Sequence, residues 1–294
     1  MHTEVPRPPP ARLPEEEAQI EESAGRLLEA AKVSAGELVS FPAVALQIIE
    51  RVHDPKADAR SVGGFISRDP ALAADVVKVA NSAAYRGVSE IESVHQAVAR
   101  LGLGEVGRVA SAVAARNLLG LPGDRAGSTA LFIRAVAVAT AAAGAALRQR
   151  GARSDHVWLG GLLHDVGRAL APHIFARIKS EPGARLTSVE LGQQVVERVH
   201  VEVGAMAIRQ WALPAYLLDI CAHHHDAEVP AEAVDLHLVR LTSALASLAG
   251  PEGASRAAKE VVQSAAALHL GPAAVRALAT ELKEAEVRAR GWVK

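Results

Sequence analysis

The 294-residue sequence predicts an all-α protein, and three features of the chain support that fold class. No stretch shows a sustained alternation of β-branched and polar residues, so no sheet is expected. Half of the residues are hydrophobic but only 3% are aromatic, and alanine, the best helix former, is abundant. Helix-start signals also recur, as where Asp69 precedes Pro70. We therefore expect helices that pack closely through small side chains.

Residues 1–33 are expected to form a proline-rich lead followed by an acidic helix. The lead is too rich in proline for a helix and is expected to be extended, either as a plain linker or as a docking peptide. The acidic helix, Glu15–Lys32, is interpreted as a loosely packed appendage or a partner contact. The terminus lacks the basic and then apolar pattern of a targeting segment.

Residues 34–120 are expected to form an amino-terminal lobe of short helices. Asp58 and Ser93 are expected to be N-caps, like Asp69. Asn81 and Ser82 are expected to end the helix that Asp69 opens, with their side chains bound to local backbone. Further helices are expected from Pro42 to His53 and from Glu105 to Leu119.

A linker is predicted at residues 121–129, which are rich in proline, glycine and aspartate. It separates the first lobe from a second lobe, residues 130–248, that opens with the alanine-rich segment Ala130–Leu147. This segment is near the minimum length for crossing a membrane, but Arg134 lies inside it and alanine is only marginally apolar. We therefore expect a helix buried on all sides, and no membrane insertion.

Three local features are predicted within the second lobe. Ser154 or Asp155 should cap the helix that follows, Thr187 and Glu190 should form a capping box, and the helix that contains His200 should break near that residue. After the second lobe, residues 251–294 are expected to form additional C-terminal helices. These are expected over Ser255–Leu268 and Pro272–Arg290.

The candidate functional stretch is WLGGLLHDVGR, residues 158–168, where an apolar helix runs into His164 and Asp165. Both side chains need partners if the helix end is buried. They are either metal ligands or caps for the carbonyls at the helix end. Further histidines follow at His200 and at 223–225.

This order of residues resembles the HD superfamily of metal-dependent phosphohydrolases and its HD-GYP branch. Within the superfamily, the chain from about Val33 to Leu248 most resembles the HDOD domain, the HD-related output domain of bacterial signalling proteins. The resemblance implies a two-lobed, all-helical fold. Its marks are FPAV (41–44), RDPAL (68–72), VANSAAY (79–85), AVARLG (97–102) and WALP (211–214).

Two positions depart from the pattern of the HD enzymes. The resemblance places their first histidine where Arg134 stands and their distal aspartate at Thr242–Ser243. A guanidinium has no lone pair to donate to a metal, and a serine hydroxyl is a poor substitute for a carboxylate. The paired-metal activation of water is therefore not expected.

The resemblance leaves one residual metal site, with candidate ligands His164, Asp165, His200, His223 and His224. By comparison with HD-GYP enzymes, Asp165 would be the bridging carboxylate. Adjacent residues lie about 100° apart around a helix, so His223 and His224 can share an ion only if the helix ends there. Alternatively, the triple histidine is an exposed helix end. We expect no cofactor, and the alternative is a single residual divalent metal ion.

The sequence therefore predicts a non-catalytic bacterial signalling protein that acts as a partner-binding or scaffold module. Arg134, His164 and Asp165 are the candidate residues for a partner or for a small anionic or nucleotide ligand. A net charge of −1 and few aromatic residues argue against nucleic-acid binding. The single cysteine, Cys221, is consistent with a cytoplasmic location.

Two alternatives stay open. One is a metal-dependent phosphohydrolase that acts on a cyclic dinucleotide through a rearranged ligand set. The other is a sensor that binds cyclic di-GMP without hydrolysing it.

Overall fold

The computed structural model describes residues 14–33, 43–54, 56–85, 87–120, 123–178, 189–248 and 254–293. This part of the chain consists of helices and their connections and contains no strand, which confirms the all-α prediction. The helices are α1 (Pro14–Val33), α2 (Ala43–His53), α3 (Ala59–Ile66), α4 (Pro70–Ala80), α5 (Val94–Leu101), α6 (Leu103–Ala115), η2 (Arg116–Leu119), α7 (Arg125–Ala146), α8 (Ser154–Leu163), α9 (Val166–Ile178), α10 (Val189–Gln210), α11 (Ala215–His223), α12 (Val234–Ser247), α13 (Ala254–Ala267) and α14 (Pro272–Arg290).

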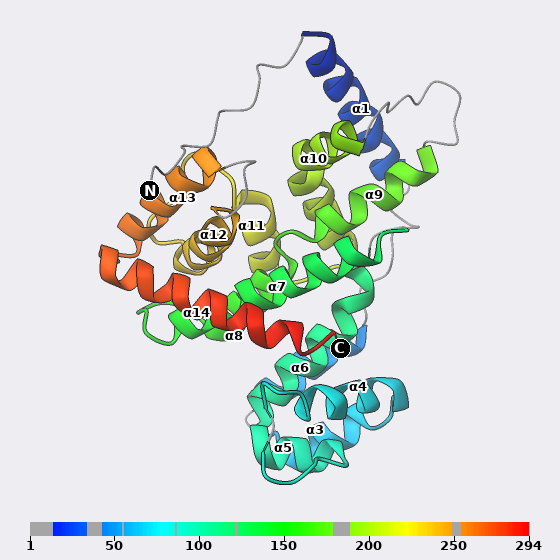
Figure 1. Cartoon of the computed structure of the whole chain (residues 1–294), viewed down its shortest axis with the longest axis vertical. Coiled ribbons are helices and arrows are strands. Elements are labelled where there is room, and N and C mark those ends of the chain that lie inside the picture. The colour runs from blue at the N-terminus through cyan, green and yellow to red at the C-terminus, as the bar shows by residue number, and fades with distance from the viewer. Residues whose placement is uncertain are drawn as a thin grey trace, which may run out of the picture.

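Helices α2 to α6 form the amino-terminal lobe, at the bottom of Figure 1. Helix α6 lies at its centre and contacts α2, α3, α4 and α5. The predicted N-caps are confirmed: the side chains of Asp58, Asp69 and Ser93 each accept a hydrogen bond from a backbone N–H group in the first turn of the next helix. Local sequence thus sets where these short helices begin.

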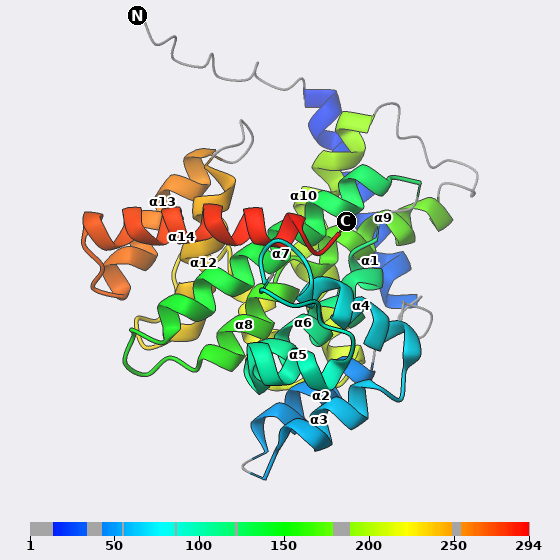
Figure 2. The same cartoon turned by 60° about the horizontal axis from the view of Figure 1, so that its bottom comes forward.

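Helix α1 packs against α10 and α9, and it lies beside α10 in both Figure 1 and Figure 2. Its apolar face is fully buried at Leu27 and nearly so at Ile20. On its polar face, Glu17 and Glu21 pair with Arg198 of α10. The acidic helix is therefore an integral part of the helical body rather than an appendage.

Helix α7 runs through the second lobe and contacts α8, α12 and α14. Small residues permit the close contact with α8: a Cβ added at Gly161 would lie 2.7 Å from the backbone of Ala139. Helix α14 lies along α7, and the chain after it reaches the amino-terminal lobe, where the rings of Trp292 and Tyr85 are 6.2 Å apart. The C-terminal helices thus connect the two lobes.

Three local expectations for the linker and the second lobe are wrong. The linker ends early, because Asp124 caps α7 by accepting a hydrogen bond from Gly127 N, so α7 begins at Arg125. Helix α10 continues through His200 without a break. The N-cap of α8 is Arg153, not Ser154 or Asp155.

The predicted partner of Glu190 in a capping box, Thr187, lies outside the described residues. Helix α7 is long and apolar enough to cross a membrane by length and composition, but 67% of its most apolar window is buried inside the fold. That burial is typical of a core helix in a helical bundle.

Candidate metal centre

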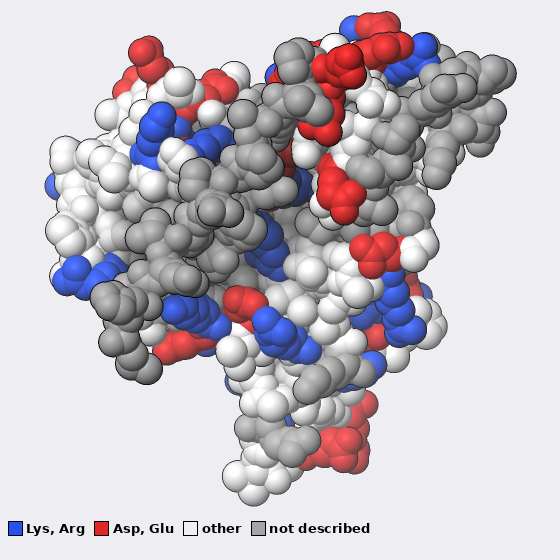
Figure 3. Space-filling view, turned by 45° about the horizontal axis from the view of Figure 1, so that its top comes forward, with Lys and Arg blue, Asp and Glu red and all other residues white. Residues whose placement is uncertain are grey.

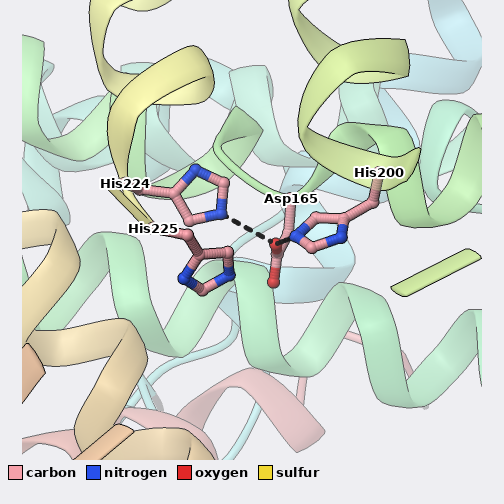
Figure 4. Close-up of side chains that lie close together, drawn as sticks. All are labelled: Asp165, His200, His224 and His225. Atoms are coloured by element: carbon pink, nitrogen blue, oxygen red, sulfur yellow. Dashed lines mark ion pairs between the residues drawn. The ribbon is translucent and has the colours of Figure 1, made fainter. Parts of the chain in front are cut away.

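The His164–Asp165 dyad lies in the short connection between α8, which ends at Leu163, and α9, which begins at Val166. Three imidazoles surround the carboxylate of Asp165 (Figure 4). His200 comes from α10, whereas His224 and His225 follow the end of α11. The cluster thus brings together three segments that are distant in the sequence.

The spacing of these side chains suits one metal ion. Asp165, His200, His224 and His225 each offer one ligand atom, and these atoms lie within 4.8 Å of one another. The Nε2 atoms of His200 and His224 are 3.5 and 3.4 Å from Asp165 Oδ1. A tetrahedral ion with bonds of about 2.1 Å would hold its ligand atoms roughly 3.4 Å apart.

Each imidazole is oriented through its Nδ1 atom. His200 and His224 each donate to the backbone carbonyl three residues earlier, both at 2.8 Å. His225 donates to Glu260 Oε1 at 2.8 Å. Because these acceptors require a proton on Nδ1, the neutral rings present Nε2 lone pairs to the cluster. Metal-binding histidines are held in this way by carbonyl and carboxylate groups.

The atoms that converge on the cluster have no hydrogen-bond partner among the described residues. They are Asp165 Oδ1 and the Nε2 atoms of His200, His224 and His225, and Asp165 Oδ2 likewise has no hydrogen-bond partner there. Leaving buried polar atoms without partners is unfavourable. A divalent cation would satisfy this arrangement, because it would accept the lone pairs that otherwise face one another.

The protonation states also suit a cation. Burial lowers the pKa of His200 to about 3 and of His225 to about 2, and it also lowers the pKa of His224. Burial by itself would raise the pKa of Asp165, but Arg168 and His164 hold it well below its usual value. Near pH 7 the cluster is thus three neutral imidazoles and one ionised carboxylate, the forms that bind metals.

The other oxygen of Asp165, Oδ2, faces different groups. It lies 3.4 Å from His164 Nε2 and 3.8 Å from Arg134 Nε. His164 is bound at both nitrogens, through a backbone carbonyl at 2.9 Å and Ser243 Oγ at 2.9 Å. Arg134 Nη2 donates to the carbonyl oxygen and hydroxyl of Ser243 and to Ser247 Oγ, at 3.1, 3.3 and 2.7 Å. A cation thus already faces this side of the carboxylate.

A second arginine, Arg168, approaches the carboxylate from α9. Its Nε lies 3.1 Å from Asp165 Oδ1, and its guanidinium also pairs with Glu197. Glu197 accepts a further hydrogen bond from Arg256 at 2.6 Å. Burial would raise the pKa of Glu197, but its hydrogen bond from Arg168 lowers the net value to about 2. Glu197 thus compensates the charge of Arg168.

Four of the five candidate metal ligands lie together: His164, Asp165, His200 and His224. His164 lies beside Asp165 but is outside the group of convergent ligand atoms. His223 is directed elsewhere; its side chain is 53% exposed, and its Nδ1 lies 2.7 Å from Asp226. The helix does end there, but the pair that turns inward is one residue further along, at His224 and His225.

Two contributors were not predicted from the sequence. His225 belongs to the histidine run, but periodicity does not say which members of a run face inward where a helix ends. Glu260 lies in α13, 35 residues after His225, and no local pattern links the two. In contrast, Arg134 and Ser243 lie beside the dyad, where the resemblance placed them.

The described part of the chain is all-helical, and a His–Asp dyad with further histidines forms a cluster that could hold a metal ion. Residues 38–227 match the sequence profile of the HDOD domain, and the chain belongs to the HDOD domain family. An uncharacterized protein from Treponema pallidum (strain Nichols) is 24% identical over 206 residues, which make up 65% of this chain. The match spans only 38% of that relative.

Solved structures share the fold. An HDOD domain protein of unknown function from Geobacter sulfurreducens has a TM-score of 0.64 and 21% identity, covering 90% of this chain and 96% of that one. A Shewanella amazonensis SB2B protein, provisionally named a metal-dependent phosphohydrolase, has a TM-score of 0.61 and 20% identity, covering 90% and 99%. A Marinobacter aquaeolei VT8 protein, provisionally named a signal transduction protein, has a TM-score of 0.64 and 23% identity, covering 93% and 64%.

Proposed function

We propose that this chain is a non-catalytic HDOD module of bacterial signalling that binds a protein partner and holds one divalent metal ion instead of a hydrolytic pair. The observation that carries the proposal is the division of Asp165 between two environments. Its Oδ1 atom faces the free Nε2 atoms of imidazoles, and the nearby Arg168 is compensated by Glu197. Its Oδ2 atom faces the guanidinium of Arg134 and His164, whose two nitrogens are both hydrogen-bonded. A carboxylate that bridges two metals would need metal ligands on both sides.

The groups on the Oδ2 side do not suit a second ion. Arg134 offers no lone pair, and its charge repels a cation. Ser243 already exchanges hydrogen bonds with His164 and Arg134. By the resemblance, Arg134 and Ser243 stand where related enzymes have a nitrogen ligand and a carboxylate. This supports a module without paired-metal hydrolysis.

On the Oδ1 side, Asp165, His200, His224 and His225 would hold the ion. Four protein ligands are typical of structural zinc sites, whereas catalytic zinc sites keep one position for water. The bound ion would supply positive charge and would link α10 to the segment after α11 and to the dyad. We propose that this cross-link fixes the surface that a partner recognises.

Metal analysis of protein purified without chelator tests the proposal. We expect about one equivalent of Zn²⁺ or a similar borderline divalent ion, as for a single tetrahedral site. His225→Ala should lose the ion, and His223→Ala is the matched control that should keep it. Two equivalents together with turnover of bis-p-nitrophenyl phosphate or a cyclic dinucleotide would overturn the non-catalytic assignment.

A metal-dependent phosphohydrolase is the second candidate. The convergence of neutral imidazoles on an ionised carboxylate favours it, since the same donors activate water in hydrolases. The provisional name of the Shewanella neighbour points the same way. Turnover that is lost with the metal would select this candidate.

Arg134 and Ser243 are the two groups that we hold responsible for the absence of a second ion. Replacing both departures, by Arg134→His with Ser243→Asp, should restore a ligand set on the Oδ2 side and raise the metal content from about one equivalent toward two. Arg125→His, on the same helix but away from the dyad, is the control. If the double variant folds and still binds one equivalent, the loss of the second ion has another cause.

We further propose that the protein acts in the cytoplasm, where a partner would dock on the helical surface around the dyad. The proline-rich lead is a separate candidate for that contact. Pull-downs with the full chain and with a chain that lacks residues 1–13 distinguish the two. Equal recovery of a partner by both would assign the contact to the helical body.

A further inference from the structure

A groove lies between α7, α12 and α14, and Arg134 is one of its lining residues. Its volume is about 840 Å³, within the range of pockets that take small organic ligands. Its floor is apolar, with Ile133 from α7, Leu245 from α12 and Leu282 from α14. The remaining apolar lining consists of alanines, which leave the space between the helices open: Ala126, Ala130, Ala137, Ala246 and Ala279.

The polar lining of this groove is strongly biased toward positive charge. Four basic side chains line it, Arg125, Arg134, Lys283 and Arg290, against one acidic side chain, Glu286. Glu286 pairs with Arg290 at 2.5 Å, both side chains being largely exposed. Figure 3 shows one face of the molecule, with several basic side chains near its middle and below it. The groove therefore combines an apolar interior with a field that attracts anions.

Arg134 gives the groove a fixed cation at its inner end. Its side chain is only 28% exposed and is held by Ser243 and Ser247. A guanidinium held in place in a partly buried site binds carboxylate, sulfonate or phosphate groups more strongly than a mobile surface lysine does. Arg125 and Lys283, which are exposed, can add long-range attraction at the rim.

We propose that this groove binds an amphipathic organic anion, a small molecule with an apolar body and one negatively charged head group. The body packs on the apolar floor, and the head group pairs with Arg134 and the basic rim. The groove contains none of the candidate metal ligands and meets the metal cluster only at Arg134, so the inference stands whether or not the chain binds a metal or a partner. A neutral apolar molecule would lack the head-group contacts, and a small inorganic anion would lack the apolar ones.

A pair of matched fluorescent probes tests the proposal on the full chain. 8-Anilinonaphthalene-1-sulfonate carries an apolar ring system and a sulfonate, and N-phenyl-1-naphthylamine has the same rings without the charge. We expect one saturable site for the sulfonate and binding of the neutral probe that is about tenfold weaker, a difference of roughly 1.4 kcal/mol. Equal binding of both probes would show that the basic side chains do not contribute.

Two sets of variants locate the site. Ala130 is exposed on α7 and lines the groove, so Ala130→Trp should fill it and abolish saturable sulfonate binding. Ala266→Trp, exposed on α13 and outside the groove, should leave binding unchanged. Lys283→Gln should weaken binding about threefold to fivefold, whereas Lys259→Gln on α13 should not.

These outcomes decide the proposal. Loss of binding in Ala130→Trp, with retention in Ala266→Trp, supports it. If Ala130→Trp does not fold, the comparison of Lys283→Gln with Lys259→Gln decides by itself. Unchanged affinity in Lys283→Gln, or sulfonate binding that does not saturate at one equivalent, would overturn the assignment of the groove.

Discussion

At the scale of single residues, Asn81 shows how one side chain closes a loop. Its amide nitrogen donates to the carbonyl oxygen of Ile91 at 2.7 Å, and its amide oxygen accepts from Ile91 N at 2.8 Å. The side chain thus satisfies both backbone groups of a buried residue ten positions further along the chain. The sequence predicts that Asn81 and Ser82 bind local backbone, and this is wrong for both. Asn81 binds a residue ten positions away, because loop closure has no periodic signal, and Ser82 Oγ has no hydrogen-bond partner among the described residues.

Asn81→Ala should lower the free energy of unfolding by about 2 kcal/mol, because it leaves two buried backbone groups without partners. Asn81→Asp should cost a similar amount, since its carboxylate keeps the acceptor but faces the carbonyl oxygen of Ile91. Urea unfolding followed by circular dichroism measures both. Glu90→Ala, exposed in the same loop, is the control and should change stability little. A loss below about 0.5 kcal/mol in Asn81→Ala would contradict this role.

Only some of the ligands of the candidate metal centre could be predicted from the sequence. Asp165, His200 and His224 could be named from the resemblance, as could the departures at Arg134 and Ser243. The choice between His223 and His225 could not, because it depends on where α11 ends and how the chain turns there. A shift of one residue at a helix end redirects every side chain after it.

At the scale of elements, the position of His200 depends on the crossing of α9 and α10. A Cβ added at Gly167, near the start of α9, would lie 1.8 Å from the carbonyl oxygen of His200 and 2.8 Å from the backbone nitrogen of Gly204. The two helices therefore meet through their backbones. Glycine at this position allows His200 to reach Asp165.

Gly167→Ala should lower the free energy of unfolding by about 3 kcal/mol, because a rigid backbone opposes the added methyl group. In this variant, any metal bound by the cluster should also be held more weakly, since α10 must move. Gly144→Ala on α7 is the matched control: nothing lies within 4 Å of its added Cβ, so helix propensity should stabilise the protein by up to about 1 kcal/mol. Thermal unfolding of both variants checks the opposite signs. A neutral Gly167→Ala would mean that the crossing can relax.

Most of the elements were predictable because their signals are local. The caps at Asp58, Asp69 and Ser93 and the apolar faces of the short helices lie within a few residues of each other. The wrong predictions of helix boundaries fall where two local signals indicate different structures. Glycine and proline suggested a linker at 121–129, but a cap at Asp124 begins α7 there. Helix α10 is also continuous through His200, which no periodicity could decide.

At the scale of the whole molecule, the candidate metal centre draws on the chain beyond the HDOD match, which ends at residue 227. Glu260 of α13 orients His225, and its side chain is only 4% exposed. Arg256, one turn earlier on α13, pairs with Glu197 beside the cluster. The C-terminal helices are therefore expected to influence the centre, although they supply no ligand themselves.

Glu260→Ala should weaken metal binding by about 10-fold to 100-fold, because the Nδ1 proton of His225 loses its acceptor and the ring loses its orientation. Competition with a chelating dye measures the affinity. Lys259→Ala, exposed on the same helix, is the control and should bind as the unaltered chain does. Equal affinities in both variants would show that α13 does not support the centre.

The groove and the candidate metal centre meet at Arg134, so, if both proposals hold, we expect binding at one site to affect the other. Arg134 lines the groove, and its Nε lies 3.8 Å from Asp165 Oδ2. Without metal, the carboxylate compensates part of the guanidinium charge. A divalent ion on the Oδ1 side would neutralise the carboxylate, so Arg134 would attract a ligand anion more strongly. Binding of Zn²⁺ should therefore tighten binding of 8-anilinonaphthalene-1-sulfonate by about fivefold, and the sulfonate should tighten Zn²⁺ binding by the same factor.

Titration of the sulfonate with and without Zn²⁺, with EDTA as the metal-free reference, measures this coupling. Arg134→Gln should abolish the coupling, since the neutral amide no longer responds to the charge of Asp165. Lys283→Gln should weaken sulfonate binding but keep the ratio between the two conditions, because this side chain lies at the rim of the groove. If the unaltered chain binds the sulfonate equally well in both conditions, the two sites are independent, and each proposal then stands on its own test.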